Sequence, residues 1–120
     1  MAKRVLIVDD ASYMRELIKD ILNKNGFEIT GEADDGEAAI TRYEQLKPDL
    51  VTMDLVMQNK SGIDAVKEIV KKDPQANILM ISAMGQQAMM VDAIQAGAKG
   101  FVIKPFKAEA LLEEVKRILG

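Results

Sequence analysis

Apolar residues along this chain fall into five short runs separated by longer amphipathic stretches. The runs lie at 5–8, 28–30, 50–53, 78–81 and 101–103. They consist mainly of β-branched and aliphatic residues, and the longer ones show no polar alternation, which is typical of strands covered on both faces. The run at 28–30 (Glu-Ile-Thr) is the least apolar, so we expect it at an edge of the sheet.

The stretches between these runs repeat apolar residues with the period of an α-helix. One face of the first stretch carries Met14, Leu17, Ile18, Ile21 and Leu22. Gly26 stands just past the expected end of this helix. Similar patterns predict helices at about 36–46, 63–70, 86–96 and 108–119. Alternating strands and helices imply right-handed crossovers, and so an α/β fold with helices on both faces of a parallel five-stranded sheet.

The composition limits the chemistry that this chain can perform. It has no Cys and no His, which excludes disulfides, thiolate nucleophiles, imidazole bases and metal sites built on those residues. Any metal must bind to oxygen, which favours a hard ion such as Mg²⁺. The net charge of −3, without a basic block, argues against nucleic acid as a partner. With no apolar run long enough to cross a membrane, we expect residues 1–120 to form one cytoplasmic domain.

Polar residues directly follow four of the predicted strands. Asp9 and Asp10 follow the first, Asp54 the third, Ser82 the fourth and Lys104 the fifth. In such sheets ligands bind beyond the carboxyl ends of the strands, so these side chains are expected to converge. Each pair of carboxylates about 5 Å apart would cost about 3 kcal/mol at an effective dielectric near 20, and a divalent cation relieves this repulsion.

This set of residues indicates a phosphoryl-transfer site. A carboxylate beside Mg²⁺, a lysine and a hydroxyl forms a cradle for phosphoryl oxygens, and Asp54 would attack phosphorus to give an aspartyl phosphate. Any single strand-end aspartate is more simply explained as a helix cap or a turn residue. The combination of all these residues at one edge favours the phosphoryl site over that simpler explanation.

Five motifs in this chain make it resemble the receiver domains of response regulators, most of all the single-domain chemotaxis regulators. They are VLIVDD at 5–10, MDLVM at 53–57, SGIDAV at 61–66, ISAMG at 81–85 and AGAKGFVIKPF at 96–106. The resemblance runs from Lys3 to about Leu119 and implies a flavodoxin-like fold with strand order 2-1-3-4-5. It leaves no room within residues 1–120 for an output domain.

The resemblance implies a role for each site residue. Asp54 would be the phosphoacceptor, and Mg²⁺ would be held by Asp10 directly, by Asp9 largely through water, by Asp54 and by the backbone carbonyl of Val56. Ser82 would move its hydroxyl toward the phosphoryl group, and Lys104 would bind a phosphoryl oxygen. Lys104-Pro105 would be a cis peptide. Phe101 stands where the family has an aromatic switch residue, although a plain core Phe explains it almost as well.

This chain departs from the family pattern in the segment after the phosphoacceptor. Gln58 replaces a common Pro, and Ser61 replaces a common Asp or Asn, which puts the geometry of this loop in question. Val56 and Met84 place apolar side chains where an attacking water should approach, so we expect a long-lived phosphorylated state. Met89 and Met90 suggest an adaptable docking surface, but methionine at helical spacing is more typical of a core.

The resemblance implies a phosphorylation-activated chemotaxis switch that is not an enzyme in the usual sense but assists its own phosphorylation and dephosphorylation. The expected partners are a CheA-like histidine kinase as donor, a FliM-like flagellar motor switch protein as target and a dedicated phosphatase. The phosphorylated form would bind its target through the fourth helix, fifth strand and fifth helix, as a monomer. The alternatives are a phosphorelay intermediate, a hydrolase with an aspartyl-phosphate intermediate, and an inactive receiver.

Overall fold

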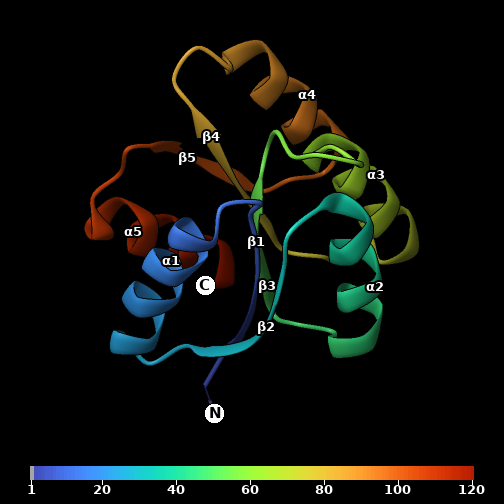
Figure 1. Ribbon diagram of the computed structural model, residues 1–120. Helices are drawn as coiled ribbons and strands as arrows, with labels where there is room; N and C mark the ends of the chain where they lie inside the picture. Colours follow the sequence, from blue (N-terminus) through green and yellow to red (C-terminus); the bar gives the residue numbers. More distant parts are fainter. Residues whose placement is uncertain (1) are drawn as a thin grey trace.

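The computed structural model describes residues 2–120, in which five strands alternate with five helices (Figure 1). The strands are β1 (Arg4–Val8), β2 (Glu28–Ala33), β3 (Leu50–Asp54), β4 (Ile78–Ala83) and β5 (Gly100–Lys104). The helices are α1 (Ser12–Lys24), α2 (Gly36–Leu46), α3 (Gly62–Lys72), α4 (Gln87–Ala96) and α5 (Ala108–Leu119). Every predicted element is therefore present.

The strands form one parallel sheet in the order β2-β1-β3-β4-β5, which confirms the doubly wound α/β fold. The predicted edge position of β2 is also confirmed. β2 extends to Ala33, three residues further than its apolar run, because pairing with β1 uses the backbone and an edge strand tolerates polar side chains. The register shifts by one residue within this pairing, because Val5 pairs with Ile29 and Leu6 with Gly31, so that Thr30 is skipped.

Helices cover both faces of the sheet (Figure 1). α2, α3 and α4 bury one face around Leu6, Val51, Met53, Val66 and Met80. α1 and α5 bury the other face around Val5, Ile7, Leu79, Leu111 and Val115. Because both faces are covered, the central strands β1, β3 and β4 are apolar over most of their length, with Thr52 on β3 as a buried polar exception.

The buried face and the end of α1 follow the sequence pattern closely. α1 buries Met14, Ile18 and Leu22 as predicted, but Leu17 is 45% exposed because it lies at the border of the buried face. Gly26, just beyond α1, has a φ of 88°, a left-handed conformation that glycine adopts easily.

Within residues 2–120, no helix combines the length and the apolar character needed to cross a membrane.

Candidate functional site

Three aspartates converge at the carboxyl ends of β1 and β3. One carboxylate oxygen from each of Asp9, Asp10 and Asp54 lies within 4.8 Å of the others. Asp9 is fully buried and Asp54 is 7% exposed, whereas Asp10 is exposed. Hard cations such as Mg²⁺ prefer a cluster of carboxylate oxygens, so the side chains present here fit this ion.

Lys104, at the end of β5, reaches across to two of these aspartates. Its Nζ lies 3.0 Å from Asp9 Oδ2 and 3.5 Å from Asp54 Oδ1. Burial lowers the pKa of the Lys104 ammonium, but the hydrogen bond that it donates to Asp9 and the charge of Asp54 outweigh this effect and raise the pKa above its ordinary value. Lys104 is therefore a fixed positive charge beside the acids. The Lys104-Pro105 peptide bond is cis, as predicted.

The environment of Asp54 makes its negative charge costly. Burial is the largest cause, and the charge of Asp9 adds to it, so that the pKa of Asp54 rises from 3.8 to about 6 although Lys104 opposes the shift. A buried carboxylate with excess negative charge around it is stabilised by any cationic group that enters the cluster. The carboxylates are therefore suited to binding a metal ion.

The backbone after β1 is held by groups that the sequence pattern did not single out. The Ala11 N–H donates to Asp9 Oδ1 at 2.9 Å, and Arg15 Nη1 donates to the Asp9 carbonyl oxygen at 2.6 Å. Glu32 on β2 accepts from Arg15 Nε at 3.0 Å and orients the guanidinium. A basic residue six positions after Asp9 is a weak signal in sequence, because most surface helices carry such residues.

The loop after Asp54 is tied to the start of α2. Asn59 Nδ2 donates to Asp35 Oδ2 at 2.7 Å, and the Gly36 N–H donates to the Lys60 carbonyl oxygen at 3.1 Å. A Cβ at Gly36 would collide with that same carbonyl oxygen, so glycine is required for this approach. Asp35 also caps α2 by accepting from the Ala38 N–H at 2.8 Å. These contacts hold a loop that lacks the family's usual proline.

The two residues that depart from the family pattern lie in this loop with different roles. Ser61 caps α3 by accepting from the Asp64 N–H at 3.2 Å, as an Asp or Asn could. Gln58 is exposed and borders a small hollow with Asp10, Asp34, Asp35 and Asn59. The Ser61 departure therefore preserves the start of α3.

The remaining predicted residues lie around the cluster. Val56 and Met84 are 47% and 73% exposed, so both present apolar surface to solvent. Phe101 is 42% exposed, which rules out a core position in this conformation. Ser82 is fully buried at the end of β4, and its hydroxyl donates to Met90 Sδ on α4, not to Asp54. The roles assigned to these side chains and to the Val56 carbonyl remain predictions.

The methionines of α4 belong to the core. Met90 is 4% exposed, and Met89 packs against the buried cluster on the same face of the sheet. The interpretation as core residues, which their helical spacing favoured, is therefore confirmed, and the alternative of an exposed docking surface is wrong. The reason is that α4 places them toward the sheet, while Val91 and Ile94 face solvent.

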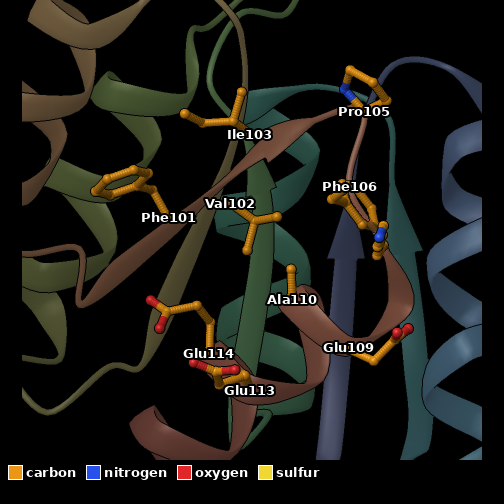
Figure 2. Close-up of a pocket in the computed structure, with 10 residues that line it drawn as sticks. Phe101, Val102, Ile103, Pro105, Phe106, Glu109, Ala110, Glu113 and Glu114 are labelled. Carbon is orange, nitrogen blue, oxygen red and sulfur yellow. The ribbon is translucent and has the colours of Figure 1, made fainter.

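A groove runs beside β5 and α5 (Figure 2). Its lining combines apolar residues of β5 and the following loop with glutamates of α5, namely Phe101, Val102, Ile103, Pro105, Phe106, Lys107, Glu109, Ala110, Glu113 and Glu114. In Figure 2 the Phe101 ring points away from the α5 residues. The face that includes Phe101 thus offers apolar contact area next to charged side chains.

Known proteins are similar to this chain in both sequence and fold. The chemotaxis protein CheY of Bacillus subtilis is 57% identical over 120 residues, covering all of both chains. CheY of Thermotoga maritima is 54% identical over 118 residues, covering 98% of each. A solved CheX–CheY–BeF3–Mg complex from Borrelia burgdorferi contains a chain with a TM-score of 0.94 and 33% identity, covering 98% of this chain and 90% of that one.

The match to a family covers almost the whole sheet. Residues 5–116 match the response regulator receiver domain, a range that begins in β1 and ends within α5. All four residues that form the charged cluster, Asp9, Asp10, Asp54 and Lys104, lie inside this range. The chain therefore belongs to the response regulator receiver domain family.

Proposed function

We propose that this protein is a chemotaxis response regulator that accepts a phosphoryl group on Asp54. The observation that carries the proposal is the meeting of Asp9, Asp10, Asp54 and Lys104 at one edge of the sheet. The chemotaxis relatives, which are similar over their whole length, support the same role. The protein acts as a switch and assists its own phosphorylation and dephosphorylation.

The residues of the chain divide the work of phosphoryl transfer. An oxygen of Asp54 attacks phosphorus while the bond from phosphorus to the donor nitrogen breaks, and the nitrogen keeps the electron pair. Lys104 stabilises the negative charge on a phosphoryl oxygen. Asp9, Asp10, Asp54 and the Val56 carbonyl would hold Mg²⁺. When bound, this ion supplies positive charge against the acids and the phosphoryl oxygens.

The output would be a change in the face formed by α4, β5 and α5. The phosphoryl group adds about −1.5 to −2 charges at the end of β3. Ser82 and Phe101 would pass this change to the groove of Figure 2, where a FliM-like motor switch protein would bind. A CheA-like kinase would be the donor, because this chain has no His to carry the phosphoryl group itself.

The test is the intact mass of the protein after incubation with acetyl phosphate, with and without Mg²⁺. We expect one phosphoryl adduct that requires both Mg²⁺ and Asp54. The Asp54→Ala variant should give no adduct, whereas Asp92→Ala, an exposed aspartate on α4, should behave as the wild type. Absence of the adduct in the wild type would contradict the proposal and favour an inactive receiver.

A further inference from the structure

The hydroxyl of Ser82 has a partner on α4 in this structure. Ser82 Oγ donates to Met90 Sδ at 2.9 Å, and both residues are buried, with 0% and 4% exposure. Ser82 lies at the end of β4, directly after Ile81, which pairs with Asp54 on β3. One side-chain hydrogen bond therefore joins the strand end beside the acid cluster to the interior of α4.

A hydroxyl has one proton to donate, so Ser82 satisfies one strong acceptor at a time. A thioether sulfur is a weak acceptor, whereas an ionised phosphoryl oxygen is a strong one. The hydrogen bond to Met90 therefore gives the buried Ser82 hydroxyl an acceptor, but it is weak enough for a phosphoryl oxygen to replace it. Without Met90 Sδ, the buried hydroxyl in this orientation would lose its acceptor.

The start of α4 is otherwise lightly held. The helix begins at Gln87 without a side-chain cap on its first N–H groups. Gln86 Oε1 instead accepts from the Ala83 N–H at 2.8 Å, which closes the turn between β4 and α4. The Ser82–Met90 bond is thus a direct side-chain link from the end of β4 to the body of this helix.

We propose that Met90 is a positioning residue, whose thioether holds the Ser82 hydroxyl away from Asp54 until a phosphoryl group competes for it. This inference rests on the proposed function. When the hydroxyl turns to the phosphoryl oxygen, α4 loses its bond to β4, so the state of Asp54 is coupled to α4. Packing alone would make Met90 a core residue with no effect on the site.

The test compares Met90→Leu with Met89→Leu. Leucine keeps the volume and apolar character of methionine, so both variants should fold, but it has no acceptor. The probe is beryllofluoride with Mg²⁺, a stand-in for the phosphoryl group, titrated by calorimetry. We expect Met90→Leu to bind it about 2- to 5-fold more tightly than the wild type, the range for loss of one weak hydrogen bond. Met89→Leu should bind it with unchanged affinity.

Ser82→Ala completes a double-mutant cycle. If Met90 acts through the hydroxyl, Met90→Leu should have no effect on beryllofluoride affinity in the Ser82→Ala background. An effect that persists in this background, or one that Met89→Leu reproduces, would overturn the inference. If the wild type itself binds no beryllofluoride, the proposed function fails, and the contact is then judged by a measurement without ligand.

That measurement uses the methyl groups of the methionines as NMR probes. With ¹³C-labelled methionine methyls, the Met90 resonance is identified by its loss in Met90→Leu. We expect Ser82→Ala to shift this resonance more than Ser12→Ala, a control at the exposed start of α1. A Met90 resonance that ignores Ser82→Ala would rule out the contact, whatever the function of the protein.

Discussion

Thr52 is a buried polar residue that the proposed chemistry does not use. It is fully buried on β3, and its Oγ1 has no hydrogen-bond partner among residues 2–120. Its register neighbours are Ile7 on β1 and Leu79 on β4, both apolar and fully buried. The hydroxyl therefore carries the cost of lost hydration without a compensating bond.

Replacing this hydroxyl by a methyl group should stabilise the protein. We expect Thr52→Val to raise the free energy of unfolding by about 1 kcal/mol, measured by urea denaturation. The matched control is Thr30→Val on β2. Thr30 Oγ1 accepts from Arg4 Nη2 at 2.7 Å, so this variant should be less stable than the wild type. A destabilised Thr52→Val would contradict this interpretation of Thr52.

We expect the Val56 side chain to lengthen the lifetime of the phosphorylated state. It lies two residues after Asp54 and is 47% exposed, so its apolar side chain disfavours an ordered water close to the proposed phosphoryl group. We expect Val56→Asn to accelerate dephosphorylation of the protein several-fold by providing a polar partner for that water. The decay of the phosphorylated protein after removal of acetyl phosphate gives the rate. The same substitution at exposed Val91 on α4 should leave the rate unchanged, and equal rates for wild type and Val56→Asn would disprove the prediction.

Among individual residues, the acids and Lys104 could be identified from sequence because they come directly after apolar runs. The residues that hydrogen-bond to the site residues could not be identified in this way. Arg15 donates to the Asp9 carbonyl, and Met90 accepts from Ser82, but nothing in the local pattern distinguishes Arg15 and Met90 from ordinary helix residues. Which acceptor a polar side chain uses depends on what the fold brings within about 3 Å of it.

Among the elements, the loop between β3 and α3 shows how one segment supports another. The family's common proline would restrict this loop by itself, but this chain has Gln58 there. The restriction comes instead from the start of α2, through the Asn59–Asp35 and Gly36–Lys60 hydrogen bonds. Asn59 also has a φ of 64°, a left-handed conformation that Asn tolerates better than most residues.

Breaking this link should loosen the loop and weaken the proposed metal site. We expect Asn59→Ala to reduce Mg²⁺ affinity by about 2- to 10-fold, the range for loss of one hydrogen bond, measured by calorimetry. Asn77→Ala is the control, because Asn77 Nδ2 donates to the Asp49 carbonyl at the opposite end of the sheet. Unchanged affinity in Asn59→Ala, or an equal loss in Asn77→Ala, would show that the link does not support the site.

Element boundaries were predictable where local signals are strong. The predicted helix at 108–119 agrees with α5, and the predicted helix at 36–46 agrees with α2. β2 was underestimated, since its residues after Thr30 are in a strand only because β1 pairs with them. The exposed position of Leu17 and the buried position of Met90 likewise depend on neighbouring elements and not on the helical period alone.

Across the whole molecule, folding forces charges together that are far apart in the unfolded chain. Asp9 follows β1 and Asp54 ends β3, yet in the fold they belong to one cluster with Asp10. The pKa of Asp54 is raised from 3.8 to about 6, first by burial and then by Asp9. The folded protein therefore binds a proton at Asp54 more readily than the unfolded chain does, and its stability falls as the pH rises from about 4 through about 6.

Removing this charge should stabilise the metal-free protein in a pH-dependent way. We expect Asp54→Asn to raise the free energy of unfolding by about 2–3 kcal/mol at pH 7.5 in EDTA. At pH 4 the gain should be under about 1 kcal/mol, because folded Asp54 is then protonated and its unfolded counterpart, with a pKa of 3.8, is close to half protonated. Urea denaturation at both pH values measures the gain, with Asp92→Asn as the control. A gain that is independent of pH would contradict the idea that the ionised form of Asp54 is costly in the folded protein.

The sequence by itself determined the architecture and the available chemistry. Alternating periods of strand and helix produce a parallel α/β sheet, and the absence of Cys and His leaves carboxylates, hydroxyls and Lys104 as the reactive groups. Only the tertiary structure decided how these groups are paired. It brings Lys104 to Asp9 across 95 positions of chain, hydrogen-bonds Asn59 to Asp35 and makes the Ser82 hydroxyl donate to Met90 Sδ. The physical reason is that periodicity reports burial along one segment, whereas a hydrogen bond requires two segments to meet at a defined distance and angle.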